Sequence, residues 1–345
     1  MISIVRFTGN EAQWDNYVQA HPRALVYHQI GWKRVIENTF GHQGHYFLAL
    51  KNGNIKGILP LFLMQSRIFG SHLISLPFLD RAGILADDDH IAALLCDKAI
   101  ALAREEQVDF LEIRNEHPLD HNDLKTVTHK AAFVLPLHNG LENIWKKGLK
   151  KNVKNKIRIA LKNQVEIKID DTIQFVEDFY KVYCINMKFL GTPVYPKEFF
   201  LNMRKEFAEN IKIFLAFSEN NLIGAKILFF FKDTLYFIIQ ASLRKYVELH
   251  PNNLLYWTAI EYAYKHEMKY CDMGRSNIDS GPYNFKKQWG PEIYPLYWQY
   301  YLYKSKQIPR LNPTNPKFSL AINIWKRLPL WLTRLVGPLI SKHIP

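Results

Sequence analysis

The stretch YFLALKNGNIKGILPLFLM at residues 46–64 decides the fold, because IFLAFSENNLIGAKILFFF at residues 213–231 repeats it without a gap. The residues that recur at a constant offset of 167 are, in the first copy, Phe47, Leu48, Ala49, Asn54, Gly57, Leu61 and Phe62. Each copy reads as a strand, a polar turn with Asn and Gly, and a second strand. This pattern predicts a β-hairpin in each copy.

The segments after the two hairpins also repeat in type and order. A helix that includes 32–38 is expected before the first hairpin. Each hairpin is then followed by an expected strand, helix and strand, at 72–79, 91–106 and 108–114 in the first copy and at 235–241, 254–267 and 269–273 in the second. The shared order predicts an α/β (α+β) protein that contains one unit twice.

The unit boundaries follow from this repeat. We expect the first unit at 1–137, the second at 138–305, and a tail of different composition at 306–345. An aromatic strand at 295–303 is expected to close the second unit.

The composition favours an anionic partner. The chain has 45 Lys and Arg against 32 Asp and Glu, a net charge of +13, which suits phosphate, nucleic acid or an acidic membrane surface. Cys96, Cys184 and Cys271 lack metal or redox spacing, so a reduced interior is expected. No signal-peptide pattern or membrane-spanning apolar run is visible, and a cytoplasmic location is therefore expected.

The junction between the units, residues 140–164, predicts an amphipathic helix. Trp145, Leu149, Val153 and Ile157 form an apolar stripe at i, i+4 spacing, and the opposite side carries Lys147, Lys151, Lys154, Arg158 and Lys162. Gly148 interrupts the first turns of this helix.

The tail has two parts. Residues 309–318 are rich in Pro and Asn and are expected to be irregular, whereas residues 320–344 mix Trp and Leu with Lys and Arg. An amphipathic basic helix of this kind suits peripheral contact with an anionic membrane at the inner face of the cytoplasmic membrane. The alternative is a helix that packs back on the domain.

The segment CDMGRSNIDSGPYNFKKQWG at 271–290 is the richest in reactive side chains. A strand end, a turn and a short helix beginning near Pro282 are expected to bring together Arg275, Ser276, Tyr283, Lys286, Lys287 and Trp289. Helix-start amides with Lys and Arg can hold a phosphate or a developing oxyanion. The alternative is that Phe285 and Trp289 pack in the core and the lysines are solvated.

This segment resembles the FKxxWG segment of the FemAB (Fem/peptidyltransferase-like) family, whose members are tandem GNAT acyltransferases with a helical arm in the second unit. The order of helix, hairpin, strand, helix and strand is similar to the GNAT fold. HQIGWKRVIENTFGH near the start, LISLPF in the first unit and LNPTNPKFSLAINIWKRLPLWLTRLVGPLIS at the end extend the resemblance, and they are most similar to FemAB-related proteins of exosortase and exopolysaccharide (PEP-CTERM) systems.

The resemblance implies transfer of an aminoacyl or acyl group to an amine of a cell-wall, peptidoglycan or exopolysaccharide precursor. No tightly bound cofactor is implied; aminoacyl-tRNA or acyl-CoA would be the donor co-substrate. The partners would be an anionic nucleotide-linked sugar or lipid-linked precursor and the acceptor end of a tRNA.

The same resemblance implies roles for individual residues. Lys286 would stabilise charge at the reacting carbonyl, with Tyr283 and Asp272 as further catalytic candidates. The substrate-binding candidates are Arg275, Ser276, Lys287, Trp289, Lys151, Arg158, Trp32 and Arg81. The relatives have an aromatic-Gly-Gly turn where this chain has LDRAG at 79–83, a difference on the acceptor side.

Several expectations concern what the sequence lacks. The glycine-rich pyrophosphate loop of coenzyme A enzymes is missing from both copies, and residues 244–253 read RKYVELHPNN instead. His28, His42 and His45 have no Cys or carboxylate at ligand spacing, so no metal site is expected. No general base stands out, although Asp272 is of the right type. Two alternatives stay open: an acyl-CoA-dependent N-acyltransferase of an amino sugar or nucleotide sugar, and a non-catalytic polysaccharide- or membrane-binding scaffold.

Overall fold

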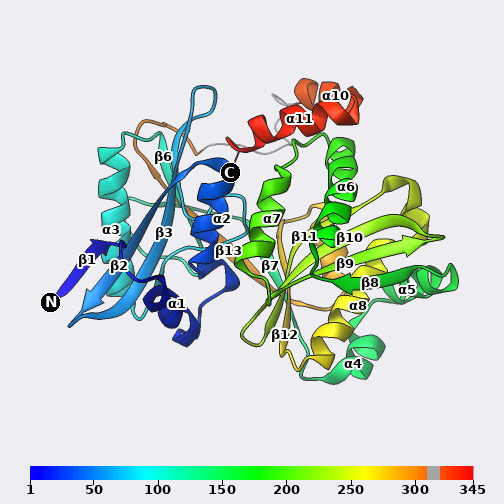
Figure 1. Ribbon diagram of the computed structural model, residues 1–345. Coiled ribbons are helices and arrows are strands. Elements are labelled where there is room, and N and C mark those ends of the chain that lie inside the picture. Colours follow the sequence, from blue (N-terminus) through cyan, green and yellow to red (C-terminus); the bar gives the residue numbers. More distant parts are fainter. Residues whose placement is uncertain (309–318, 345) are drawn as a thin grey trace. The chain divides into compact units, whose positions relative to one another are not determined.

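The computed structural model describes residues 1–308 and 319–344, which fall into two compact units (Figure 1). Unit 1 contains residues 1–130, 295–308 and 342–344, and unit 2 contains residues 131–294 and 319–341. No helix within these ranges is long and apolar enough to cross a lipid bilayer. The Pro- and Asn-rich segment at 309–318 lies outside the described residues.

Unit 1 is a sheet with strand order β1-β2-β3-β4-β6-β13, and β5 pairs with β3. Its elements are β1 Ile2–Arg6, α1 Glu11–Ala20, α2 Gly31–Phe40, β2 Gln43–Lys51, β3 Asn54–Ser66, β4 Gly70–Ile74, β5 Leu85–Ala86, α3 Asp89–Glu105, β6 Phe110–Asn115 and β13 Glu292–Leu302. The predicted hairpin is the antiparallel pair β2–β3, and β4 runs parallel to β6 after the α3 crossover.

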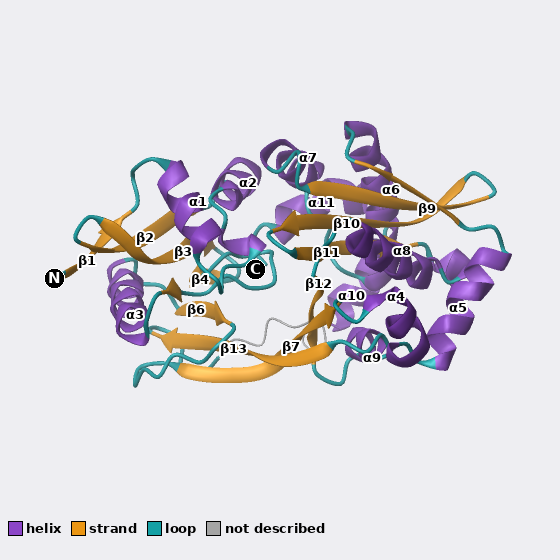
Figure 2. Ribbon diagram, turned by 90° about the horizontal axis from the view of Figure 1, so that it is seen from below, coloured by secondary structure: helices purple, strands orange, loops and turns teal. Residues whose placement is uncertain are grey.

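Unit 2 has strand order β7-β12-β11-β10-β9-β8. Its strands are β7 Lys125–Pro136, β8 Glu166–Asp170, β9 Ile211–Ser218, β10 Asn221–Phe231, β11 Thr234–Ser242 and β12 Tyr270–Asn277. Its helices are α4 Gly140–Asn143, α5 Lys151–Lys162, α6 Ile173–Leu190, α7 Lys197–Glu206, α8 Pro251–Lys265, α9 Gly281–Lys287, α10 Ser319–Arg327 and α11 Leu330–Ser341. Helices α6 and α8 cover opposite faces of β9–β11 (Figures 1 and 2).

The two units share one plan, and this confirms the repeat. In each, an antiparallel hairpin leads to a third strand, a crossover helix and a parallel fourth strand. The repeated glycine explains part of the shared sequence. A Cβ on Gly57 would meet Ile91 of α3 at 2.8 Å, and one on Gly224 would meet Leu255 of α8 at 3.3 Å, so both glycines let the crossover helix approach the hairpin.

Three elements differ from the sequence predictions. β13 was expected to close unit 2, and its pairing with β6 of unit 1, which is antiparallel, was not expected. The strand expected at 72–79 ends at Ile74, because Leu76 and Phe78 have left-handed φ angles of 49° and 69° that break the ladder. The junction is not one helix. It is divided into α4, a π-helical turn at Ile144–Gly148, and α5.

Candidate active site in the second unit

Two parallel strands of unit 2 separate part of the way along their length. β11 and β12 pair only from Thr234 with Tyr270 to Tyr236 with Asp272, although they continue to Ser242 and Asn277. A register shift between β10 and β11 leaves Ile238 as an extra residue at the point of separation. Bulges of this kind often lie next to active sites because they redirect side chains.

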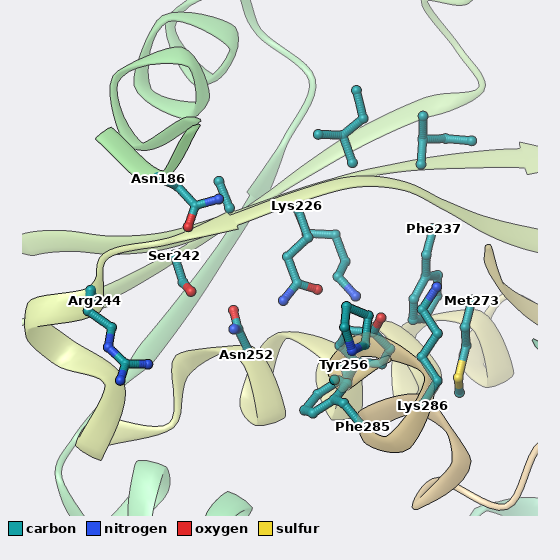
Figure 3. A pocket seen from close by; sticks show the side chains of 16 residues that line it. Asn186, Lys226, Phe237, Ser242, Arg244, Asn252, Tyr256, Met273, Phe285 and Lys286 are labelled. Atoms are coloured by element: carbon teal, nitrogen blue, oxygen red, sulfur yellow. The ribbon is translucent and has the colours of Figure 1, made fainter. Parts of the chain in front are cut away.

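A cavity of about 620 Å³ lies on this part of unit 2 (Figure 3). It is lined by β10, β11, β12, the start of α8 and α9, with one residue from α6. The lining residues are Asn186, Lys226, Phe237, Ile238, Ile239, Gln240, Ala241, Ser242, Arg244, Asn252, Tyr256, Met273, Gly281, Pro282, Phe285 and Lys286. Ligands of α/β folds tend to bind at the carboxyl ends of strands, and this cavity has that position.

The corresponding place in unit 1 carries a buried arginine, and the cavity beside it has a volume of only about 60 Å³. The residue two positions beyond the last paired residue of the fourth strand is Arg114 in unit 1 and Gly274 in unit 2. Arg114 is buried, pairs with Glu112 at 2.6 Å and donates to the backbone oxygens of Leu76 and Leu79 at 3.4 and 2.8 Å. Gly274 has no side chain that could make such contacts in unit 2.

Lys286 reaches the cavity from α9. Ser280 caps this helix by accepting a hydrogen bond from the Tyr283 amide at 3.2 Å, and Pro282 fixes its first turn. The Lys286 side chain is buried, and its ammonium donates to the backbone oxygen of Arg275 at 2.8 Å. α9 therefore holds a fixed amine at the cavity wall.

The rest of the FKKQWG segment anchors that helix. Phe285 and Trp289 pack against Tyr256 with ring centroids 5.0 and 5.2 Å apart, and Trp289 is fully buried. A Cβ on Gly290 would lie 2.8 Å from the Gly148 oxygen, so this glycine allows the junction to approach closely. The Lys150 amide also donates to the Gln288 oxygen at 3.1 Å. Trp289 is thus a packing residue that anchors α9.

Lys226 is a cavity residue that the sequence analysis missed. It lies in β10, is 1% exposed, and places its amine 3.1 Å from the centroid of the Tyr256 ring and 3.9 Å from that of Phe237. Burial, reinforced by the charge of Lys286, holds the pKa of Lys226 well below its ordinary value of 10.5. The only signal in the sequence is one lysine inside an apolar strand.

Arg244 and Asn252 lie toward the end of the cavity where α8 begins (Figure 3). Arg244 is exposed, and Asn252 follows Pro251 in the first turn of the 15-residue helix α8. A helix N-terminus beside an arginine suits a phosphate, because backbone N–H groups and a guanidinium both favour an anion. The sequence analysis named Asn252 only as a helix cap and did not single out Arg244.

Of the residues predicted for the site, only Lys286 is among the described residues that line the cavity. Asp272 is buried and accepts from the Gly274 amide at 2.8 Å, and the Ser276 side chain is also buried. The ring of Tyr283 lies 5.2 Å from that of Phe133, and Lys287 is exposed. These residues stand beside the cavity wall without lining it, and their predicted roles stay predictions.

The other predicted residues lie elsewhere. Lys151 and Arg158 are exposed on α5, where Arg158 lies 5.7 Å from the Trp145 ring. In unit 1, Trp32 is fully buried with its indole N–H donating to the Val26 oxygen, and Arg81 is buried and pairs with Glu116 at 3.2 Å. Among residues 1–308 and 319–344, no group of three His, Cys, Asp or Glu side chains is placed to hold a metal ion.

Two units of this topology, one with an open cavity between separated parallel strands, define a tandem GNAT acyltransferase fold. Residues 147–287 match the acetyltransferase (GNAT) domain family, and that domain includes both cavity lysines. The protein is therefore an acyltransferase. GNAT domains imply donors of the acyl-CoA type.

Solved structures share this fold across most of the chain. FemX covers 92% of this chain and 100% of its own, with a TM-score of 0.68 and 14% identity. A tandem GNAT protein from the clavulanic acid biosynthesis pathway covers 87% of this chain and 98% of its own, with a TM-score of 0.56 and 12% identity.

The C-terminal domain of a putative lysylphosphatidylglycerol synthetase from Agrobacterium fabrum is a third similar structure. It covers 84% of this chain and 90% of its own, with a TM-score of 0.58 and 9% identity. No curated protein matches the chain by sequence. At these identities the structural likeness concerns the fold.

Proposed function

We propose that the protein transfers an aminoacyl or acyl group from a phosphate-bearing donor to an amine of a cell-envelope or exopolysaccharide precursor. The observation that carries this proposal is Lys286 of the FKKQWG segment, fixed at the wall of a cavity in a GNAT domain. A fixed ammonium stabilises the negative charge that develops on the oxygen of a carbonyl under attack. The FemX likeness and the lysylphosphatidylglycerol synthetase name support an envelope acceptor.

The donor would place its phosphate near Arg244 and the start of α8, and its acyl carbonyl near Lys286. Coenzyme A thioesters and aminoacyl-tRNA both carry phosphate groups, so the shared chemistry is an activated acyl group on a phosphate-bearing carrier. The absence of a glycine-rich loop at 244–253 favours aminoacyl-tRNA, and the GNAT domain match favours acyl-CoA.

A thermal-shift and native mass panel tests the donor. Coenzyme A, acetyl-CoA, aminoacyl-tRNA and nucleotide-linked sugars are added separately, and a ligand at 100 times its Kd is expected to stabilise the protein by about 2.7 kcal/mol. Arg244→Gln is expected to weaken donor binding about 10-fold to 100-fold, because a charge-assisted hydrogen bond to phosphate is lost.

The matched control is Lys245→Gln, which removes the exposed neighbouring charge and is expected to change donor affinity less than threefold, about 0.6 kcal/mol. Stabilisation by coenzyme A compounds alone would assign an acyl-CoA donor, and stabilisation by charged tRNA would assign an aminoacyl donor. No binding of either donor would contradict the proposed function.

The tail helices suggest that the acceptor is reached at a membrane. α10 and α11 pack on α6, and their buried side includes Trp325, Thr333 and Gly337, where a Cβ would meet Val194 at 2.7 Å. Their outer side is apolar and exposed, with Leu320, Ile324, Trp331, Leu335 and Leu339. Lys326, Arg327 and Arg334 are also exposed on these helices. Such a face suits an anionic lipid surface, so we include peripheral membrane contact at the inner face of the cytoplasmic membrane in the proposal.

Vesicle sedimentation tests this contact. The protein is expected to bind vesicles that contain anionic phosphatidylglycerol more strongly than neutral phosphatidylcholine vesicles. Changing Trp331 and Leu335 together to Asp is expected to weaken binding at least about tenfold, because two large apolar side chains no longer enter the bilayer. Ile173→Asp changes an equally exposed apolar residue of α6 and serves as the control. Equal binding by both variants would remove the membrane from the proposal.

A further inference from the structure

The cavity of unit 2 lacks the usual proton acceptors. Among its described lining residues there is no Asp, Glu or His, and the side chains that can ionise are Lys226, Arg244, Tyr256 and Lys286. An amine acceptor must lose a proton as it attacks a carbonyl, so a transferase benefits from a base within reach. Arginine stays protonated in proteins, and the Lys286 ammonium already donates to a backbone oxygen. Lys226 is the remaining amine.

The surroundings of Lys226 do not supply a counter-charge. Its amine has no hydrogen-bond partner within the described part of the chain and is 1% exposed. The residues opposite it in the sheet are Phe214 of β9 and Gln240 of β11. The titratable groups that face it from the other packed elements are Lys286 of α9, Cys271 of β12 and Tyr256 of α8. A buried lysine without a carboxylate beside it favours the neutral amine.

The cavity wall also contains side-chain oxygens that have no hydrogen-bond partner among the described residues. The side-chain oxygens of Gln240 and Asn252 are buried and accept no hydrogen bond from any described residue. Buried polar atoms usually have partners, so these oxygens can accept hydrogen bonds from a ligand that carries N–H or O–H donors. An amine or an amino sugar has such donors. The wall therefore combines a neutral amine with groups that can orient an acceptor nitrogen.

We propose that Lys226 is the general base of the transfer reaction, accepting a proton from the acceptor amine while Lys286 holds the carbonyl oxygen. In this step the acceptor nitrogen forms a bond to the acyl carbon, and the bond from that carbon to the donor oxygen or sulfur breaks. The proton leaves the acceptor nitrogen for the Lys226 amine and is then passed to the departing oxygen or sulfur. This inference rests on the proposed function.

The two lysines are suited to different tasks. Lys286 donates to the Arg275 oxygen at 2.8 Å, whereas the Lys226 amine is buried and has no hydrogen-bond partner within the described part of the chain. The charge of Lys286 lowers the pKa of Lys226 and so keeps the base available. One amine is held charged to bind an oxyanion, and the other is held neutral to take a proton.

The first test is independent of activity. Protein labelled with ¹³C at the lysine ε carbon is titrated by NMR, and the Lys226 signal is assigned by its loss in Lys226→Met. The Lys226 signal is expected to titrate well below pH 10.5. Methionine fits an apolar site of this size, so Lys226→Met is expected to unfold at a temperature no lower than the native protein. Titration of Lys226 in the ordinary range would overturn the inference.

The second test uses transfer rates with the donor identified by the binding panel. Lys226→Met is expected to lower kcat about 10²–10⁴-fold with little change in KM, and to abolish the rise of rate with pH that a general base would give the native protein. Added ethylamine is expected to restore part of the rate in Lys226→Ala, which a purely structural role would not produce. Native rates in Lys226→Met would overturn this inference alone, whereas no transfer by the native protein would overturn the proposed function and the inference with it.

Discussion

Lys286→Met is expected to lower kcat for acyl transfer by about 10²–10³-fold, the usual effect of removing one donor from an oxyanion site. Lys286 is fixed by its bond to the Arg275 oxygen and by the capped helix α9, so its ammonium needs little reorganisation during the reaction. Methionine keeps the packing of a side chain that is only 8% exposed. The loss should therefore appear in kcat, and the unfolding temperature should change little.

The pH profile gives this prediction a second readout. Because the Lys286 charge lowers the pKa of Lys226, removing that charge is expected to raise it. The base form of Lys226 would then require a higher pH, and the rising limb of the residual activity should move to higher pH. Lys205→Ala, an exposed lysine of α7, is the control and should leave both rate and profile unchanged. A native kcat in Lys286→Met would exclude Lys286 from the chemistry.

The repeated hairpins made the fold predictable, because seven identical residues mark equivalent positions in two hydrogen-bonded pairs. The strand with which β13 pairs could not be predicted in the same way. Alternation of apolar residues identifies a strand, but its partner is chosen by contacts far apart in the sequence, here Tyr300 with Glu112. The end of β4 at Ile74 also could not be predicted from the sequence, because Leu76 and Phe78 are apolar residues, which rarely adopt positive φ angles.

Only the part of the candidate site that lies on one continuous segment could be predicted from the sequence. The FKKQWG segment identified Lys286, since neighbouring residues on one short helix stay together in the fold. Lys226 lies 60 residues earlier, and only the separation of β11 from β12 brings it to the same cavity. A lysine in an apolar strand is the local signal that could have identified it. Arg244 carries no such signal, because exposed arginines are common.

Arg114→Met is expected to destabilise the protein by about 3–5 kcal/mol, the typical cost of leaving one charge of a buried ion pair alone. Arg114 and Glu112 are 1% and 4% exposed. The guanidinium also holds the segment after β4, where Leu76 and Phe78 have strained positive φ angles, through bonds to two backbone oxygens. Urea unfolding at pH 7 measures the loss. Arg104→Met, which breaks an exposed pair with Asp123, is the control and should cost much less than Arg114→Met.

The dependence of the free energy of unfolding on pH should reverse in Arg114→Met. In the native protein, burial alone would raise the pKa of Glu112, but the charges of Arg114 and Lys130 outweigh burial and hold the pKa below its ordinary value of 4.5. This stabilisation is therefore complete above pH 4.5 and is lost as the pH falls through the lower native pKa. Without Arg114, burial dominates over Lys130 and the pKa of Glu112 should rise above 4.5. The variant should then lose stability as pH rises from 4 to 7, where Glu112 must ionise in the core. Destabilisation that is equal at pH 4 and pH 7 would show that the cost comes from packing rather than from the unpaired carboxylate.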